Sequence, residues 1–296
     1  MKKDKSAIIF AILAFTIWGL FPFYFKSINH FSSLEITAYR IVWSFLTLFF
    51  FLVFKIKILE VARAIFFDGH MYKLLISTVL IAVNWFLFVY AIEQNKILQT
   101  SFGYFISPLL SILLGVFILK EKISRMKIVA SILLVISIGI QSFSYDQLPW
   151  ISLVIAITFS LYGLTRKYIP IGSVDCVTFE TFVLFIPSFI ILFKLESSGS
   201  GHYLVASGID HLLIACSGIL TITPMILFTA AAKRLPISNL GFIQFIAPSL
   251  QFIIGAFYYN EIMDSTKWIS FTIIWFACLL VAIDGIRMNN TSEDLI

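Results

Sequence analysis

The sequence predicts an all-α integral membrane protein with ten transmembrane helices in two inverted-topology five-helix repeats. Three observations predict this fold class: an extreme apolar composition, ten apolar runs of membrane-spanning length, and a long internal repeat. Of 296 residues, 60% are hydrophobic and 12% are charged, and the mean hydropathy is +0.98. A water-soluble core of 33.7 kDa could not hide 32 Phe side chains, whereas lipid-facing helices expose such side chains without penalty.

Apolar windows of about 20 residues place the spans along the chain. The first span follows the short basic head Met1 to Lys5 and is too long for a signal-peptide core. The ten predicted ranges are 6–25, 34–54, 72–92, 97–119, 126–144, 149–166, 174–194, 210–232, 237–258 and 268–286.

Lysine and arginine fall unequally on the two sides of these spans. One side carries Lys2, Lys3, Lys5, Lys55, Lys57, Arg63, Lys73, Lys120, Lys122, Arg125, Lys127, Arg166, Lys167, Lys233, Arg234 and Arg287, and the other carries Lys26, Lys96, Lys194 and Lys267. By the positive-inside rule both termini are predicted to be cytoplasmic. Orientation thus explains the net charge of +5 without a nucleic-acid partner.

The stretch from Ile97 to Glu121 occurs twice in the chain. An offset of 140 residues lays it without a gap on Ile237 to Glu261. The identities include Phe105/Phe245, Pro108/Pro248, Gly115/Gly255 and Glu121/Glu261. The repeat predicts halves at 1–145 and 146–296 within one integrated membrane domain. Because each half has five spans, the second enters the membrane upside down, as in the inverted repeats of secondary transporters.

A weaker match extends the repeat toward the start of each half. At an offset of 144 residues, Phe15 to Tyr24 meets Phe159 to Tyr168, with Gly19 on Gly163. Chance similarity between apolar segments is the alternative explanation for this short pair.

The fourth and ninth spans each carry one polar or small face. At a period of 3.6 residues this face comprises Ser101, Tyr104, Pro108, Ser111 and Gly115, and in the second half Gly241, Gln244, Pro248, Gln251 and Gly255. Each proline is predicted to bend its helix, because it cannot donate to the carbonyl four residues earlier. The face lines either a substrate cavity or a helix-packing seam, and Gln244 and Gln251 favour the cavity.

Arg40 lies inside the predicted second span. An intramembrane arginine is costly unless it faces the bundle interior, so Arg40 is a candidate for a substrate or gating role. The alternatives are snorkelling to the outer interface and pairing with Glu35, but Glu35 is five residues away and does not share the helix face of Arg40. Asn84 and Trp18 are further candidates for the cavity lining, with aromatic belts or packing as the alternative.

Carboxylates are scarce within the spans. Glu35 and Glu180 lie near the starts of the second and seventh spans, which the inverted topology puts on opposite sides of the membrane. Their scarcity makes them candidates for proton coupling. Glu121 instead borders the basic loop from Lys120 to Lys127 and is expected to organise that loop.

An enzyme or an ATPase is difficult to assemble from these residues. The four histidines lie in loops or at helix ends, and the sequence has no HExxH, Gly-x-Ser-x-Gly or P-loop motif. Three isolated cysteines lack metal-ligand spacing and an even count, so neither a metal site nor a disulfide framework is expected. We therefore predict no enzymatic activity, no catalytic residues, no cofactor and no metal.

Several motifs together resemble one known family. They are FTIWGLFPFYFK (15–26), EITAYRIVWS (35–44), NWFLFVYA (84–91), SFGYFISPLLSILLG (101–115), SLYGLTRK (160–167), FTAAAKRL (228–235) and LGFIQFIAPSLQF (240–252). The chain resembles, over nearly its whole length, the RarD branch of the drug/metabolite transporter superfamily, whose bacterial members are named chloramphenicol-sensitive proteins and contain EamA-type repeats.

This resemblance implies a bacterial inner-membrane carrier with ten helices and alternating access. Relatives include exporters of amino acids, metabolites and drugs, so the branch does not fix the substrate. The predicted function is secondary active transport of small organic metabolites or drugs, with the lipid bilayer, a small-molecule substrate and, if the carrier is proton-coupled, protons as partners. The alternatives are a structural or regulatory membrane protein and an intramembrane enzyme. Oligomeric state, a monomer included, stays open.

Overall fold

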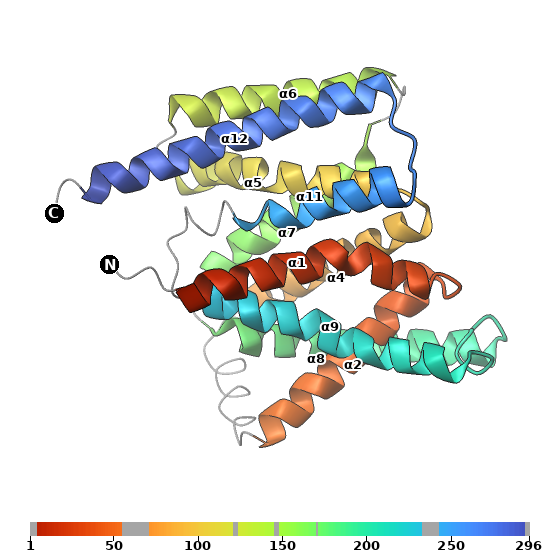
Figure 1. Cartoon of the computed structure of the whole chain (residues 1–296). Helices are drawn as coiled ribbons and strands as arrows, with labels where there is room; N and C mark the ends of the chain where they lie inside the picture. Colours follow the sequence, from red (N-terminus) through yellow and green to blue (C-terminus); the bar gives the residue numbers. More distant parts are fainter. Residues whose placement is uncertain are drawn as a thin grey trace.

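The computed structural model describes residues 5–54, 71–120, 124–144, 148–169, 171–232 and 243–293. Every regular element within these ranges is a helix, and together the helices form one bundle (Figure 1). The elements are α1 (Lys5–Ser27), α2 (Ser33–Phe54), α4 (Met71–Glu93), α5 (Ile97–Leu119), α6 (Arg125–Ser144), α7 (Trp150–Lys167), α8 (Ser173–Ser197), α9 (Gly208–Ala232), α11 (Ile246–Ile253), the π-helical turn η1 (Ile254–Tyr258) and α12 (Ser265–Glu293).

Ten apolar helical segments account for the ten predicted spans. Eight of the described helices are long and apolar enough to cross a membrane, and two shorter apolar helices cover Trp150–Arg166 and Ile246–Tyr258. The predicted fold class is therefore confirmed. For the predicted ninth span, 237–258, residues 237–242 lie outside the described ranges, and the remainder comprises α11 and η1.

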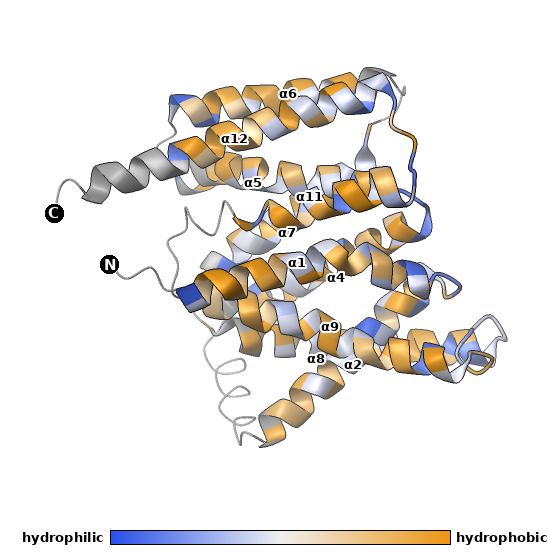
Figure 2. Cartoon of the chain, viewed as in Figure 1, coloured by the Kyte–Doolittle hydropathy of each residue, from blue (hydrophilic) through white to orange (hydrophobic). Residues whose placement is uncertain are grey.

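The outside of the bundle carries large apolar side chains. Figure 2 shows apolar residues along most of the helix surfaces and hydrophilic residues mainly at the connections. Phe50, Val79 and Phe193 are more than half exposed in the middle or later turns of their helices. In water such a surface would be unstable, whereas lipid tails are its natural solvent. The chain is a multi-pass membrane protein.

Helix packing follows the correspondence between the two repeats. The mates are α1 and α7, α2 and α8, α4 and α9, α5 and α11, and α6 and α12. The packing of α5 on α7 is matched by that of α11 on α1, and α2 on α9 is matched by α8 on α4. The mates α2 and α8, α5 and α11, and α6 and α12 also pack on each other; Figure 1 shows the last pair side by side. This pattern is that of a pseudo-two-fold axis, although the boundary at 145/146 stays a prediction.

The two described ends of the chain lie at one end of the bundle. In Figure 1 the start of α1 and the end of α12 are both at the left, and the α1–α2 and α8–α9 connections are at the right. An even number of spans requires this arrangement. In the orientation predicted from the basic residues, the right-hand end is the outer side.

Gly19 brings α1 close to α11. A Cβ atom on Gly19 would lie 2.7 Å from Cδ1 of Leu250 and 3.3 Å from Cα of Ala247. Its repeat mate Gly163 faces open space, with no atom within 4 Å of such a Cβ. The first glycine therefore permits a close helix contact that the second does not make.

Candidate functional site

Arg40 is buried where both halves of the chain meet. It lies on α2, seven residues after the helix begins at Ser33, or about 10 Å along its axis, and it is 3% exposed. Its Nε donates to Oγ1 of Thr221 on α9 at 2.7 Å. The guanidinium carbon lies 4.5 Å from the ring centre of Trp85, and 5.5 and 5.6 Å from those of Phe21 and Phe25. Arg40 thus points into the bundle and does not snorkel.

The charge of Arg40 has no anionic partner in the described part of the chain. No described carboxylate lies within the 4.0 Å of an ion pair, and Nη1, which is fully buried, has no hydrogen-bond partner. The three aromatic rings offer cation–π attraction to the guanidinium, which offsets part of the cost of burying it. The two N–H donors of Nη1 therefore remain unused.

Glu35 does not pair with Arg40, as its place on another face of α2 predicts. Its Oε2 accepts from the backbone N–H and hydroxyl of Ser32, while Oγ of Ser32 accepts from the Glu35 N–H, which forms a capping box at the start of α2. The backbone N–H of His202 donates to its Oε1 at 2.8 Å, and Nδ1 of the same histidine lies 2.8 Å from Oε2. Glu35 therefore joins α2 to the α8–α9 connection.

Glu180 occupies the position in α8 that Arg40 occupies in α2. Each lies seven residues after the first serine of its helix, and the offset between them is 140 residues. Glu180 is fully buried and accepts from Ser77 at 2.6 Å and from the hydroxyl of Tyr162 at 3.2 Å. Nη1 of Arg166 lies 4.0 Å from Oε1 of Glu180.

The two ionisable mates are held in equivalent ways. Arg40 on α2 bonds a hydroxyl of α9, and Glu180 on α8 bonds a hydroxyl of α4, the mate of α9. Ser77 is the counterpart of Ser217, whose carbonyl accepts from Thr221. The two sites differ in charge balance, because Glu180 has Arg166 nearby, whereas Arg40 has no carboxylate nearby among the described residues.

Asn84 and Tyr104 are brought together beside this cluster. The hydroxyl of Tyr104 donates to Oδ1 of Asn84 at 3.0 Å. Nδ2 of Asn84 donates to the carbonyl of Ile155 and to Oγ1 of Thr158, so the amide joins α4, α5 and α7. The ring of Tyr104 packs at 5.9 Å on that of Phe88, which also contacts Phe21 and Phe25 beneath Arg40.

The remaining predicted residues on the polar face separate into two groups. Gln251 is buried and bridges α5 and α1: its Oε1 accepts from Thr100 and its Nε2 donates to the Trp18 carbonyl at 3.3 Å. Ser101 donates to the carbonyl of Pro248 at 2.7 Å. In this conformation these groups form hydrogen bonds across the α5–α11 seam.

Two predicted residues lie apart from the Arg40 cluster. Ser111 is exposed on α5, two turns beyond Tyr104, and Gln244 is half-buried in the turn that precedes α11. Pro108 lies inside α5, whereas Pro248 falls in the first turn of α11, where the absent N–H has no helical partner to lose. Gly241 and Glu121 lie outside the described residues.

Glu261 makes the contact that joins α5 to the loop after η1. Its two carboxylate oxygens accept from the backbone N–H groups of Ile97 and Leu98, the latter at 2.9 Å. These are the first donors of α5, which have no partner inside the helix. Burial nonetheless holds the pKa of Glu261 above its usual value, although these two bonds and nearby Lys267 and Lys26 oppose the shift.

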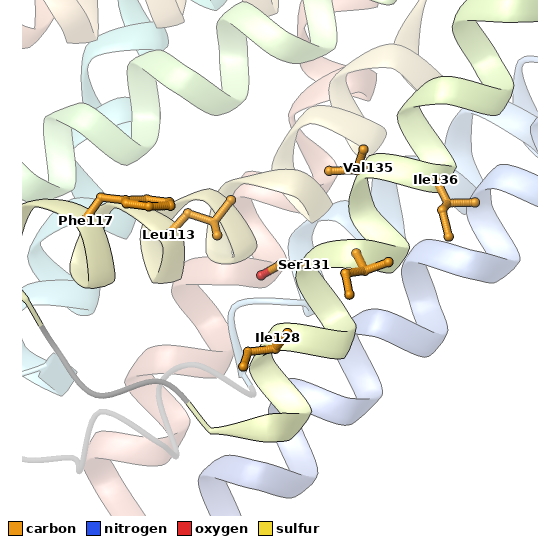
Figure 3. A pocket seen from close by; sticks show the side chains of 7 residues that line it. Leu113, Phe117, Ile128, Ser131, Val135 and Ile136 are labelled. Carbon is orange, nitrogen blue, oxygen red and sulfur yellow. The ribbon is translucent and has the colours of Figure 1, made fainter.

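An apolar groove lies between α5 and α6. Figure 3 shows side chains of Leu113, Phe117, Ile128 and Ser131 around it, between α5 and α6. Its volume is about 420 Å³, and apart from the Ser131 hydroxyl its lining is apolar. None of the candidate site residues lines it, so this groove and the Arg40 cluster are separate features.

Sequence reasoning missed several neighbours of Arg40 and Glu180. Thr221, Phe21 and Phe25 carry no pattern that marks them, because they reach Arg40 through helix packing between segments far apart in the sequence. The pairing of Arg40 with Glu180 was available from the 140-residue offset. In the described residues no group of three or more His, Cys, Asp or Glu side chains could hold a metal ion.

Apolar exterior, paired inverted repeats and an enclosed polar cluster together define a class of protein: a multi-pass membrane protein with the architecture of secondary transporters. A solved crystal structure with 13% sequence identity shares this fold, with a TM-score of 0.63 over 95% of this chain and 99% of that one. The sequence profile of the EamA-like transporter family matches residues 5–143.

Relatives that match over nearly the whole chain indicate the branch of the family. The uncharacterized transporter YojE of Bacillus subtilis is 36% identical over 98% of both chains. The RarD proteins of Salmonella typhi and Escherichia coli are each 35% identical over 96% of this chain, and the matches cover 97% and 96% of their own lengths. The chain belongs to the EamA-like transporter family, as a RarD-type member of the drug/metabolite transporter superfamily.

Proposed function

We propose that this protein is a secondary active transporter that moves small organic metabolites or drugs across the bacterial inner membrane by alternating access. The observation that carries the proposal is the enclosed cluster around Arg40, to which the first half contributes α1, α2 and α4 and the second half contributes Thr221. A site between two inverted halves is exposed to one side or the other when the halves rock against each other.

The orientation follows from the basic residues. The proposed carrier has both termini in the cytoplasm, so the Arg40 cluster lies in the outer half of the membrane and Glu180 in the inner half. Glu261 bonds the start of α5 near the outer surface. Opening the site to the outside would separate these two elements, so this contact is part of the proposed outer gate.

Energy for transport would come from a proton gradient or from exchange of substrates. Glu180 is the stronger candidate for proton coupling, because it is fully buried in the membrane and bonded to two hydroxyl groups. Glu35 is the second candidate, with His202 as its neighbour. If Glu35→Gln and Glu180→Gln variants both keep full transport driven by a pH gradient, proton coupling through these carboxylates is excluded.

Counterflow into proteoliposomes tests the proposed function. Vesicles are loaded with one member of a panel of amino acids, organic acids and amphenicol drugs, and uptake of the same labelled compound is followed. A carrier shows a transient accumulation of label that depends on the internal load. Each exit of an unlabelled molecule returns the binding site to the outside, where it binds a labelled one. A structural or regulatory protein gives no load-dependent uptake with any compound. An intramembrane enzyme would instead convert a compound without moving it.

A further inference from the structure

We propose that Arg40 binds the carboxylate of a singly charged organic anion whose apolar or aromatic body packs against Trp85, Phe21 and Phe25. This inference rests on the proposed transport function and names the substrate class of that site. It is carried by the guanidinium geometry and by the absence of a described anion beside it.

The charge balance of the cluster is the first argument. Arg40 is 3% exposed, yet in the described part of the chain no carboxylate pairs with it and its Nη1 has no hydrogen-bond partner. Burying an uncompensated charge inside a protein is strongly unfavourable. A carboxylate at Nη1 would supply both the missing acceptor and the missing charge.

Neighbouring acids do not supply that charge. Glu35 is bonded to Ser32 and His202, and Glu180 to Ser77 and Tyr162. Two phenols, Tyr24 and Tyr104, lie near enough to interact with the charge of Arg40. Both hydroxyls already donate to protein acceptors: Tyr24 to the carbonyl of Leu213, and Tyr104 to Oδ1 of Asn84. No described side chain therefore supplies the anion that would balance Arg40, and the carboxylate of a ligand would supply it.

The surroundings of the guanidinium indicate what accompanies the carboxylate. Three aromatic rings lie within 6 Å of Cζ, and the hydroxyl of Thr221 is the polar group bonded to Nε. Aromatic surfaces favour an apolar or aromatic body over a sugar or a polar chain. A dianionic phosphate would bring a second charge with no cation to meet it, so a monocarboxylate fits better.

Equilibrium binding in detergent tests this inference without requiring flux. The probes are phenylacetate and indole-3-propionate, each paired with its uncharged amide, and the readout is the ligand-induced rise in the thermal unfolding midpoint. The acids are expected to raise the midpoint of the wild type, and the amides are not. Loss of charge-assisted hydrogen bonds should weaken binding of the acids to Arg40→Met by about 10- to 100-fold.

Two controls separate binding from folding. Arg40→Met replaces a buried charge with an apolar side chain of similar length, so the free variant should unfold at or above the wild-type midpoint. Lys194→Met removes an exposed cation at the end of α8 and should bind the acids as the wild type does. If Arg40→Met aggregates, Arg40→Lys is measured instead; it keeps the charge, loses the fork, and should bind less tightly.

The outcomes distinguish this inference from the proposed function. If neither acid shifts the wild type, or if the Arg40 variants bind the acids as the wild type does, the inference is wrong. Counterflow of neutral or cationic compounds that Arg40→Met leaves intact would also overturn it, while transport would stand. Acid binding that depends on Arg40, with no counterflow of any compound, would support the inference and contradict transport.

Discussion

Removal of the Glu261 side chain should destabilise the start of α5. Ile97 and Leu98 are buried, and their backbone N–H groups have the Glu261 carboxylate as their acceptor. In Glu261→Ala both donors lose that acceptor, and each buried unsatisfied donor costs about 1–3 kcal/mol. Relief of the buried carboxylate offsets part of this cost, so a net loss of about 2–4 kcal/mol in unfolding free energy is expected.

Glu261→Gln provides the matched variant. Its one side-chain oxygen can accept from one of the two N–H groups, but its NH2 donates and leaves the other N–H without that acceptor. The amide also carries no charge that burial would disfavour. Its stability should therefore lie between those of Glu261→Ala and the wild type, with a loss of about 1–2 kcal/mol. Ile262→Ala, one residue further on and 80% exposed, truncates a side chain in the same loop and should change little.

Thermal or denaturant unfolding in detergent measures these differences. The expected order of stability is Glu261→Ala lowest, Glu261→Gln intermediate, and Ile262→Ala equal to the wild type. Equal losses for Glu261→Ala and Glu261→Gln, or no loss for Glu261→Ala, would refute the assignment of Glu261 as the cap of α5.

Three further predictions concern Gly19, Tyr104 and the pH dependence of stability. Gly19→Ala should destabilise by about 1–3 kcal/mol because its Cβ meets α11, whereas Gly163→Ala should be neutral or stabilise by up to about 1 kcal/mol; equal effects would contradict the close approach. Tyr104→Phe keeps the ring but leaves the buried Asn84 oxygen without its donor, so unfolding measurements should show a loss of about 1–3 kcal/mol. The raised pKa of Glu261 favours its protonated form in the folded state. This carboxyl therefore stabilises the protein most at a pH below its pKa in the unfolded chain, and the stabilisation should decline as pH rises through its pKa in the folded state. Glu261→Gln should lack this pH dependence.

The fold was predictable because its causes are local in sequence. Lipid requires long apolar runs, and the copy of Ile97–Glu121 at Ile237–Glu261 requires an inverted second half. Both follow from composition and spacing alone. Helix ends were also close: the predicted spans 97–119 and 126–144 compare with α5 at Ile97–Leu119 and α6 at Arg125–Ser144.

The site was predictable in part, for a physical reason. A charge inside a span must face the interior, so Arg40 was identifiable from sequence. Asn84 is also buried, and it is joined to the Arg40 cluster through Tyr104 and Phe88. The partners were not identifiable, because Thr221 reaches Arg40 across 181 positions of sequence through helix packing. A shared helix face also does not imply a shared environment, since Ser101 is buried and Ser111 is exposed.

The capping box at Ser32 and Glu35 was readable from the sequence. A serine followed three residues later by a glutamate, before an apolar run, predicts a helix start. That pattern gives Glu35 a structural role at the outer end of α2, and the structure contains both of its reciprocal bonds. The same pattern recurs at Ser207 and Asp210 at the start of α9. A carboxylate near a helix start is therefore weaker support for proton coupling than one in the middle of a span.

Counterflow of a labelled aromatic monocarboxylate shows whether this protein is a carrier whose substrate site contains Arg40. Proteoliposomes that contain the wild type, Arg40→Met or Lys194→Met are loaded with unlabelled acid, and uptake of the labelled acid is followed. We expect load-dependent transient accumulation with the wild type and Lys194→Met, and its loss with Arg40→Met. Equal accumulation with all three proteins, or none with the wild type, would contradict a carrier whose substrate site is centred on Arg40.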